Sequence, residues 1–284
     1  MNKRFLLLPL LFSFALTAAV QGATTRTIAL ESGVTVRYVE AGPREAPPLL
    51  LLHGLGDTSR SWSLMLPELA KSHRVYAFDQ RGHGAASAPR CCYALADLAW
   101  DAIAFMDAMK IERASVVGHS MGSFVAQHLA AHHPERVQKI VLIGSSDTTV
   151  GNETVAWLWE QTGTFDRGIS TEFVEQWQSN PLPVDAEFLA LVKRETAAVR
   201  PHVWRGVART LMTEDQRPFA RAIRQPTLIL WGEHDPAFPA ANQQRLQEAL
   251  PQATFRRYDK AGHNVHWEIP TRVAEDILRF LDGK

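Results

Sequence analysis

Short apolar runs recur along the chain from residue 34 onward, and segments with apolar residues at three-to-four spacing lie between them. The runs are rich in Val, Ile and Leu and do not alternate with polar residues, which is typical of strands buried on both faces of a sheet. The predicted strands are 34–39, 49–52, 75–78, 115–117, 140–143, 227–231 and 254–258, and the predicted helices are 62–71, 95–109, 121–132, 242–250 and 271–281. This alternation predicts an α/β fold with a mostly parallel, doubly wound sheet flanked by helices.

The interval 147–217 interrupts this alternation. It contains no strand-like run, but helix-like stretches occur at 154–161, 171–178 and 187–198. Because a structureless loop of this length is improbable in a compact domain, we expect a helical insertion that divides the core into residues 24–146 and 218–284.

Residues 1–23 resemble a secretory signal peptide. Lys3 and Arg4 precede an apolar run over 5–20, and small residues follow it. The run is shorter than the roughly 20 residues of a membrane-spanning helix, so an uncleaved anchor is the weaker alternative. We therefore expect a periplasmic or secreted protein with no stable membrane span after processing.

Composition and charge narrow the class of protein further. The 284 residues include 30 basic and 30 acidic side chains, and 46% are hydrophobic, which excludes a disordered or low-complexity chain. No basic block suggests a nucleic-acid partner. The two cysteines, Cys91 and Cys92, are adjacent and cannot cross-link distant elements, and the sequence leaves open whether they form a disulfide.

Residues 115–123 join a predicted strand to a predicted helix through Gly118-His119-Ser120-Met121-Gly122. A Gly-x-Ser-x-Gly sequence in this context is typical of a nucleophile elbow, a sharp turn that exposes the serine at the helix N-terminus. The glycines lack the Cβ atoms that would collide in such a turn. We therefore expect Ser120 to be a nucleophile.

A serine hydroxyl needs a base to accept its proton and an acid to orient that base. His263 follows the last predicted strand, and Asp235 follows the strand before it, so both belong to loops at the carboxyl edge of the sheet, as Ser120 does. His266 is the alternative base. Glu233 and Asp147 are alternative acids.

An oxyanion hole would complete the site. The turn His53-Gly54-Leu55-Gly56 follows an apolar strand, and its glycines allow the backbone amides to face the site. We expect the amides of Leu55 and Met121 to be the two donors.

Together these residues resemble the α/β-hydrolase family, in which nucleophile, acid and histidine occur in the order Ser120, Asp235, His263. The resemblance implies an eight-stranded sheet, a helical cap at 147–217, a structural role for the turn at 79–84, and no metal or organic cofactor. Epoxide hydrolases and haloalkane dehalogenases of this fold have an aspartate at the elbow, whereas this chain has Ser120.

The resemblance therefore implies a serine hydrolase that cleaves a small carboxylic ester or lactone through an acyl-enzyme, as a monomer or small homo-oligomer. Two alternatives stay open. One is cleavage of a C–C or amide bond by the same triad, although His119 stands where C–C hydrolases often have Asn, and the other is a non-catalytic ligand-binding homologue. If the cap tryptophans line the pocket rather than pack in the core, apolar acyl groups are favoured; they are Trp157, Trp159, Trp177 and Trp204.

Overall fold

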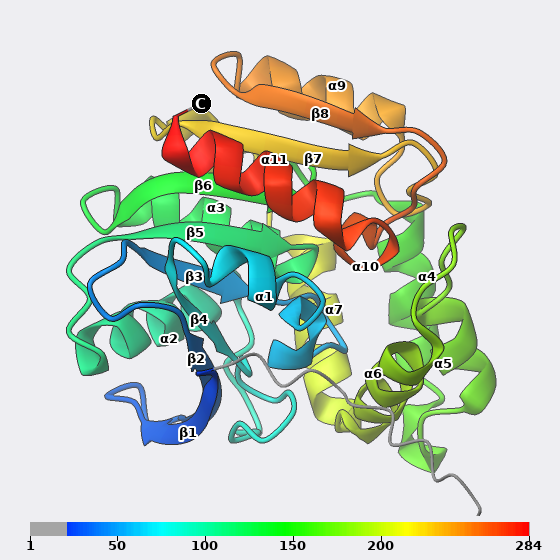
Figure 1. Cartoon of the computed structure of the whole chain (residues 1–284). Coiled ribbons are helices and arrows are strands. Elements are labelled where there is room, and N and C mark those ends of the chain that lie inside the picture. Colours follow the sequence, from blue (N-terminus) through cyan, green and yellow to red (C-terminus); the bar gives the residue numbers. More distant parts are fainter. Residues whose placement is uncertain (1–21, 284) are drawn as a thin grey trace, which may run out of the picture.

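The computed structural model describes residues 22–283 and contains an eight-stranded sheet (Figure 1). Residues 1–21 of the predicted leader lie outside the described residues. The strands are β1 (Thr24–Ala29), β2 (Thr35–Ala41), β3 (Pro48–Leu52), β4 (Arg74–Phe78), β5 (Ala114–His119), β6 (Val137–Ile143), β7 (Thr227–Gly232) and β8 (Thr254–Tyr258). Their order is β1-β2-β4-β3-β5-β6-β7-β8, and only the pairs of β2 with β1 and β4 are antiparallel. The predicted mostly parallel sheet is confirmed.

Helices cover both faces of this sheet (Figure 1). Leu50 and Leu52 of β3 pack into a core shared with α2 (Leu95–Ala108), α3 (Met121–His132) and α9 (Ala240–Ala249), whereas Leu49 and Leu51 pack into a second core shared with α1 (Leu66–Leu69) and α11 (Pro270–Asp282). Because successive side chains of a strand point to opposite faces, one apolar run supplies both cores.

The predicted helix over 62–71 is wrong. The structure has a 3-10 turn, η1 (Ser59–Trp62), followed by the four residues of α1. Pro67 lies in the first turn of α1. In a continuous helix, position 67 would have to donate a backbone N–H, which proline lacks. The ring of Pro67 would also clash with the preceding turn.

Four helices leave the core between β6 and β7, and we call them the cap. They are α4 (Glu153–Thr162), α5 (Thr171–Trp177), α6 (Ala186–Ala198) and α7 (Pro201–Thr213), with the short turn η2 (Phe165–Arg167) after α4. Asn152, Ser170 and Asp185 accept hydrogen bonds from the first turns of α4, α5 and α6, which fixes where each helix begins. The cap lies beyond the carboxyl ends of the strands (Figure 1).

The two ends of this insertion are joined. The Thr149 N–H donates to Gln216 Oε1 at 2.9 Å, and the Thr149 hydroxyl donates to Leu211 O at 2.5 Å. After Gln216, α8 (Arg217–Ala222) packs against α3 on the way to β7. The chain therefore leaves and rejoins the core at one place.

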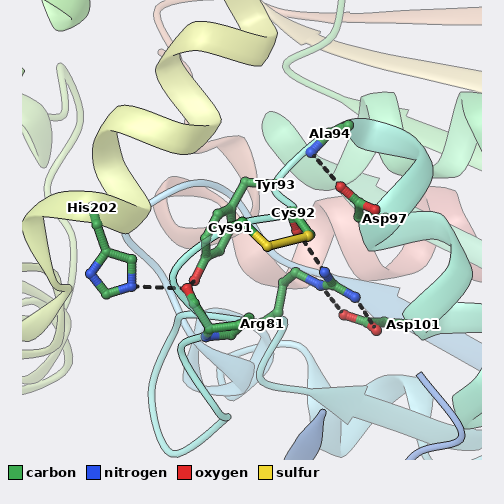
Figure 2. The surroundings of a disulfide bond; sticks show 9 residues. Arg81, Cys91, Cys92, Tyr93, Ala94, Asp97, Asp101 and His202 are labelled. Carbon is green, nitrogen blue, oxygen red and sulfur yellow. Dashed lines mark hydrogen bonds and ion pairs between the residues drawn. A yellow bond between two sulfur atoms is a disulfide. The ribbon is translucent and has the colours of Figure 1, made fainter. Parts of the chain in front are cut away.

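The loop between β4 and α2 contains a disulfide between Cys91 and Cys92, which answers the question that the sequence left open (Figure 2). Both cysteines are exposed. Arg81 forms a buried ion pair with Asp101 at 2.5 Å and donates to the Cys92 carbonyl at 2.6 Å. The base of this exposed loop is thus attached to the core by a buried guanidinium.

Candidate active site

Ser120 occupies the turn between β5 and α3, with φ 50° and ψ −120°. Its N–H donates to Ile143 O of β6 at 3.0 Å. A Cβ on Gly118 would lie 2.3 Å from Gly122 O, and a Cβ on Gly122 would lie 2.1 Å from Leu52 O. No side chain fits at either position, so the elbow requires both glycines and holds Ser120 in a backbone conformation that costs free energy.

His263 and Asp235 form a hydrogen-bonded pair across the ends of β8 and β7. His263 Nδ1 lies 2.9 Å from Asp235 Oδ2. Asp235 Oδ1 accepts from the backbone N–H groups of Ala237 and Phe238 at 2.8 and 3.1 Å. Burial lowers the pKa of His263, but the carboxylates of Asp235, Asp57 and Glu268, with Asp235 foremost, together raise it more, so the pKa lies above the ordinary value of 6.5. The pair has the arrangement of a base held in one tautomer by an acid.

The alternative acids and base do not have this arrangement. Glu233 is exposed and lies 3.7 Å from Arg257, while Asp147 pairs with Arg245. His266 is buried beneath the site, where its Nε2 lies 3.0 Å from the Ser61 hydroxyl. None of these three residues contacts the cavity described below.

Leu55 and Met121, the expected oxyanion donors, belong to the turn after β3 and to the elbow itself. Leu55 follows β3, and its N–H has no hydrogen-bond acceptor among residues 22–283. Met121 is the first residue of α3, where an N–H has no partner within the helix. Both amides are therefore available to a developing oxyanion.

Three further residues belong to this site, although the sequence analysis did not select them. Asp57 Oδ1 accepts from Gln178 of the cap at 3.1 Å, and Asp57 Oδ2 lies 3.6 Å from Nδ1 of His119. Burial lowers the pKa of His119 more than Asp57 raises it, so His119 is neutral and Asp57 carries the charge. These contacts join segments far apart in the sequence. His119 lies within the elbow motif, but no local motif marks Asp57 or Gln178.

Gly144, which follows β6, is a further residue that the sequence analysis did not select. A Cβ there would lie 2.9 Å from both Cε1 and Nδ1 of His263, and Gly144 has φ 52°. The imidazole of His263 therefore packs on the bare backbone of Gly144. Its only sequence signal is a glycine at the carboxyl end of a predicted strand.

A cavity of about 400 Å³ lies between the core and the cap, and Ser120 and His263 both line it. Much of its wall is apolar, including Phe124, Val155, Trp157, Leu158, Trp177, Leu211 and Phe238. Two of the four cap tryptophans thus face the cavity, whereas Trp204 is fully buried in packing and Trp159 is 36% exposed.

The cavity wall has acidic side chains but no lysine or arginine among the described residues that line it. The acids are Asp57 and Glu153.

Within residues 22–283, no three His, Cys, Asp or Glu side chains are grouped so that they could hold a metal ion. In the same part of the chain, no helix has both the length and the apolar character needed to cross a bilayer.

Residues 47–177 and 203–270 match the sequence profile of a family described as alpha/beta hydrolase fold. The chain is 29% identical over 248 residues to 2-hydroxymuconate semialdehyde hydrolase of a Pseudomonas species, covering 82% of this chain and 86% of the relative. It is 27% identical over 241 residues to 3-oxoadipate enol-lactonase 2 of Acinetobacter baylyi, covering 84% and 89%. The crystal structure of the enol-lactonase from Burkholderia xenovorans superposes with a TM-score of 0.81 at 26% identity, covering 90% of this chain and 100% of that chain.

Proposed function

The chain belongs to the α/β-hydrolase family, and from this premise we propose that it is a serine hydrolase that cleaves uncharged carboxylic esters or lactones. The observation that carries the proposal is one cavity lined by Ser120, on a strained elbow, and by His263, which is hydrogen-bonded to Asp235. Hydrolase names among the relatives support the general class of reaction.

The proposed reaction follows the positions of these groups. His263 accepts the proton of the Ser120 hydroxyl as Oγ attacks the carbonyl carbon, and the amides of Leu55 and Met121 stabilise the oxyanion. His263 then protonates the leaving alkoxide, which gives an acyl-enzyme. A water molecule deprotonated by His263 then attacks the acyl carbon, and His263 returns that proton to Ser120 Oγ as the acid is released.

The charge of the cavity wall favours uncharged substrates. The names of the two relatives refer to a 3-oxoadipate enol-lactone and to 2-hydroxymuconate semialdehyde, both of which bear carboxylates. In this chain a substrate carboxylate would lie in a cavity whose described lining residues include Asp57 and Glu153 but no Lys or Arg. Juxtaposed like charges cost several kcal/mol, so we expect a neutral acyl group to lie against the apolar side of the cavity.

A substrate panel tests the proposal. Nitrophenyl esters of graded acyl length, a lactone, an amide and a diketone are compared, with Ser120→Ala as the blank. We expect hydrolysis of esters or lactones with a preference for apolar acyl groups, and labelling by a fluorophosphonate that Ser120→Ala abolishes. Turnover of the diketone alone would instead support C–C bond cleavage, and a folded protein that neither labels nor turns over any substrate would support a binding role.

A matched pair of esters tests the charge preference. Nitrophenyl butyrate and mono-nitrophenyl succinate have similar size, but only the second bears a carboxylate. We expect kcat/KM to be at least about tenfold lower for the succinate. Equal values for the two esters would contradict the electrostatic argument and leave ester hydrolysis itself intact.

We also propose that the protein is exported to the periplasm or secreted, on the basis of the basic and apolar pattern of residues 1–23. Cell fractionation followed by N-terminal sequencing tests this. A shortened N-terminus in the periplasmic or extracellular fraction is the expected result. An intact N-terminus in the cytoplasmic fraction contradicts it.

A further inference from the structure

The turn that carries the Leu55 amide is held on its core side by His53. The backbone N–H of Gln80 donates to His53 Nε2 at 3.0 Å, so the ring proton is on Nδ1, which donates to Gly54 O at 2.8 Å. In a trans peptide the C=O and N–H point in opposite directions. By fixing the Gly54 carbonyl, His53 directs the Leu55 N–H away from the core.

The next two carbonyls of the turn are held by the cap. Trp177 Nε1 donates to Leu55 O at 3.0 Å. The Thr196 hydroxyl lies 3.1 Å from Gly56 O and 2.9 Å from Val192 O, one turn earlier in α6, so its single proton is shared between these two carbonyls. Gln178 Nε2 then donates to both Asp57 and Thr196, at 3.1 and 2.8 Å. We call Trp177, Gln178 and Thr196 the clamp, because they bind three consecutive residues of the turn.

The segment that continues from the clamp also reaches the histidine loop. Asn264, beside His263, donates to Asn180 Oδ1 at 3.0 Å. Pro181 packs so closely on Gly262 that a Cβ there would lie 2.5 Å from Pro181 Cδ. One stretch of the cap therefore contacts both the loop of the candidate base and the turn of the candidate oxyanion donor.

We propose that the clamp is a positioning element, which holds the Leu55 amide where the oxyanion forms. The inference rests on the proposed function. Thr196 and Gln178 are fully buried, and Thr196 does not line the cavity, so its hydroxyl acts on the turn without touching substrate. Stabilisation by preorganised donors requires that they do not move as charge develops. Loosening the turn therefore lowers kcat and leaves KM almost unchanged.

Thr196→Val tests this with little change of shape, because valine keeps the branched side chain and has a methyl group in place of the hydroxyl. Thr196→Ser restores the hydroxyl. Thr162→Val is the matched control, since Thr162 is also buried in a cap helix but its hydroxyl donates, among residues 22–283, only to Trp159 O at 2.7 Å. Trp177→Phe is the second variant, which removes the N–H that binds Leu55 O. Because Trp177 also lines the cavity, this variant is judged by kcat and Ki and not by KM, and it carries the test if Thr196→Val does not fold.

The measurements are kcat and KM on the best ester of the panel, and Ki for a trifluoromethyl ketone with the same acyl chain, which forms a tetrahedral adduct with the serine. For Thr196→Val we expect kcat to fall about tenfold, less than the roughly 10²–10³ lost with a whole donor, and Ki to rise by a similar factor. KM should stay within about twofold, and Thr196→Ser and Thr162→Val should match the wild type.

Two results would overturn the proposal, and they differ from each other. If the wild type hydrolyses esters but Thr196→Val and Trp177→Phe leave kcat and Ki unchanged, or change only KM, the clamp does not position the donor. If the wild type hydrolyses no substrate of the panel, the proposed function fails first and the positioning role fails with it.

Discussion

Replacing Ser120 by glycine should stabilise the fold relative to replacing it by alanine. Both variants lack the hydroxyl, but only glycine adopts φ 50° and ψ −120° without steric strain. Strain at such a position costs of order 1–3 kcal/mol. Glycine in turn lowers the free energy of unfolding by roughly 0.5–1 kcal/mol relative to alanine, because it gives the unfolded chain more conformational freedom. The difference favours Ser120→Gly by on the order of 1 kcal/mol, or about 2 °C in Tm for a chain of this size.

Thermal unfolding followed by circular dichroism measures this difference, and both variants should lack esterase activity. Ser63 provides the control, because it is exposed and has φ −61° and ψ −30°, an ordinary helical conformation. There Ser63→Gly should be less stable than Ser63→Ala by roughly 0.5–1 kcal/mol, the opposite sign. If Ser120→Gly is no more stable than Ser120→Ala, the elbow stores no strain and the reasoning is wrong.

Three further outcomes follow from the contacts described above. The acid limb of the pH profile of kcat/KM should have its midpoint above pH 6.5, because His263 must be neutral to act as base and its pKa is raised. A midpoint below pH 6.5 would contradict this. Asp101→Asn should lower the free energy of unfolding by roughly 3–5 kcal/mol in urea, since it leaves the buried Arg81 guanidinium without its counter-ion, and an unchanged urea midpoint contradicts this. The double variant Cys91→Ser, Cys92→Ser should keep its stability within about 0.5 kcal/mol, because a bridge between exposed neighbours closes almost no loop, and a large drop in Tm would show otherwise.

The buried strands could be predicted because each contains a run of apolar residues, as in the four leucines of β3. β1 was not predicted, since its residues are mostly exposed at the edge of the sheet and leave no apolar pattern. The cap helix α7 was also missed. It contains Gly206, which packs against Tyr93 and weakens the helical signal.

The candidate site divides in a similar way. Ser120, His263 and Asp235 could be selected because a local motif or a position after a predicted strand places each of them at one edge of the sheet. Asp57 and Gln178 could not, because their pairing depends on how the cap folds back over the turn after β3. Sequence patterns report the element to which a residue belongs, whereas contacts between the core and an insertion depend on the tertiary arrangement.

The hydrogen bonds of Thr149 that join the two ends of the cap bear on whether the cap can be exchanged between related proteins. A segment whose ends meet can be exchanged for another without altering the register of the sheet, as domain insertions generally can. Here, however, the exchanged piece would also carry the groups that bind Leu55 and Gly56. We therefore expect a grafted cap to change both the substrate preference and kcat. Only a graft that keeps the hydrogen-bond donors at positions 177 and 196 should change the substrate preference alone.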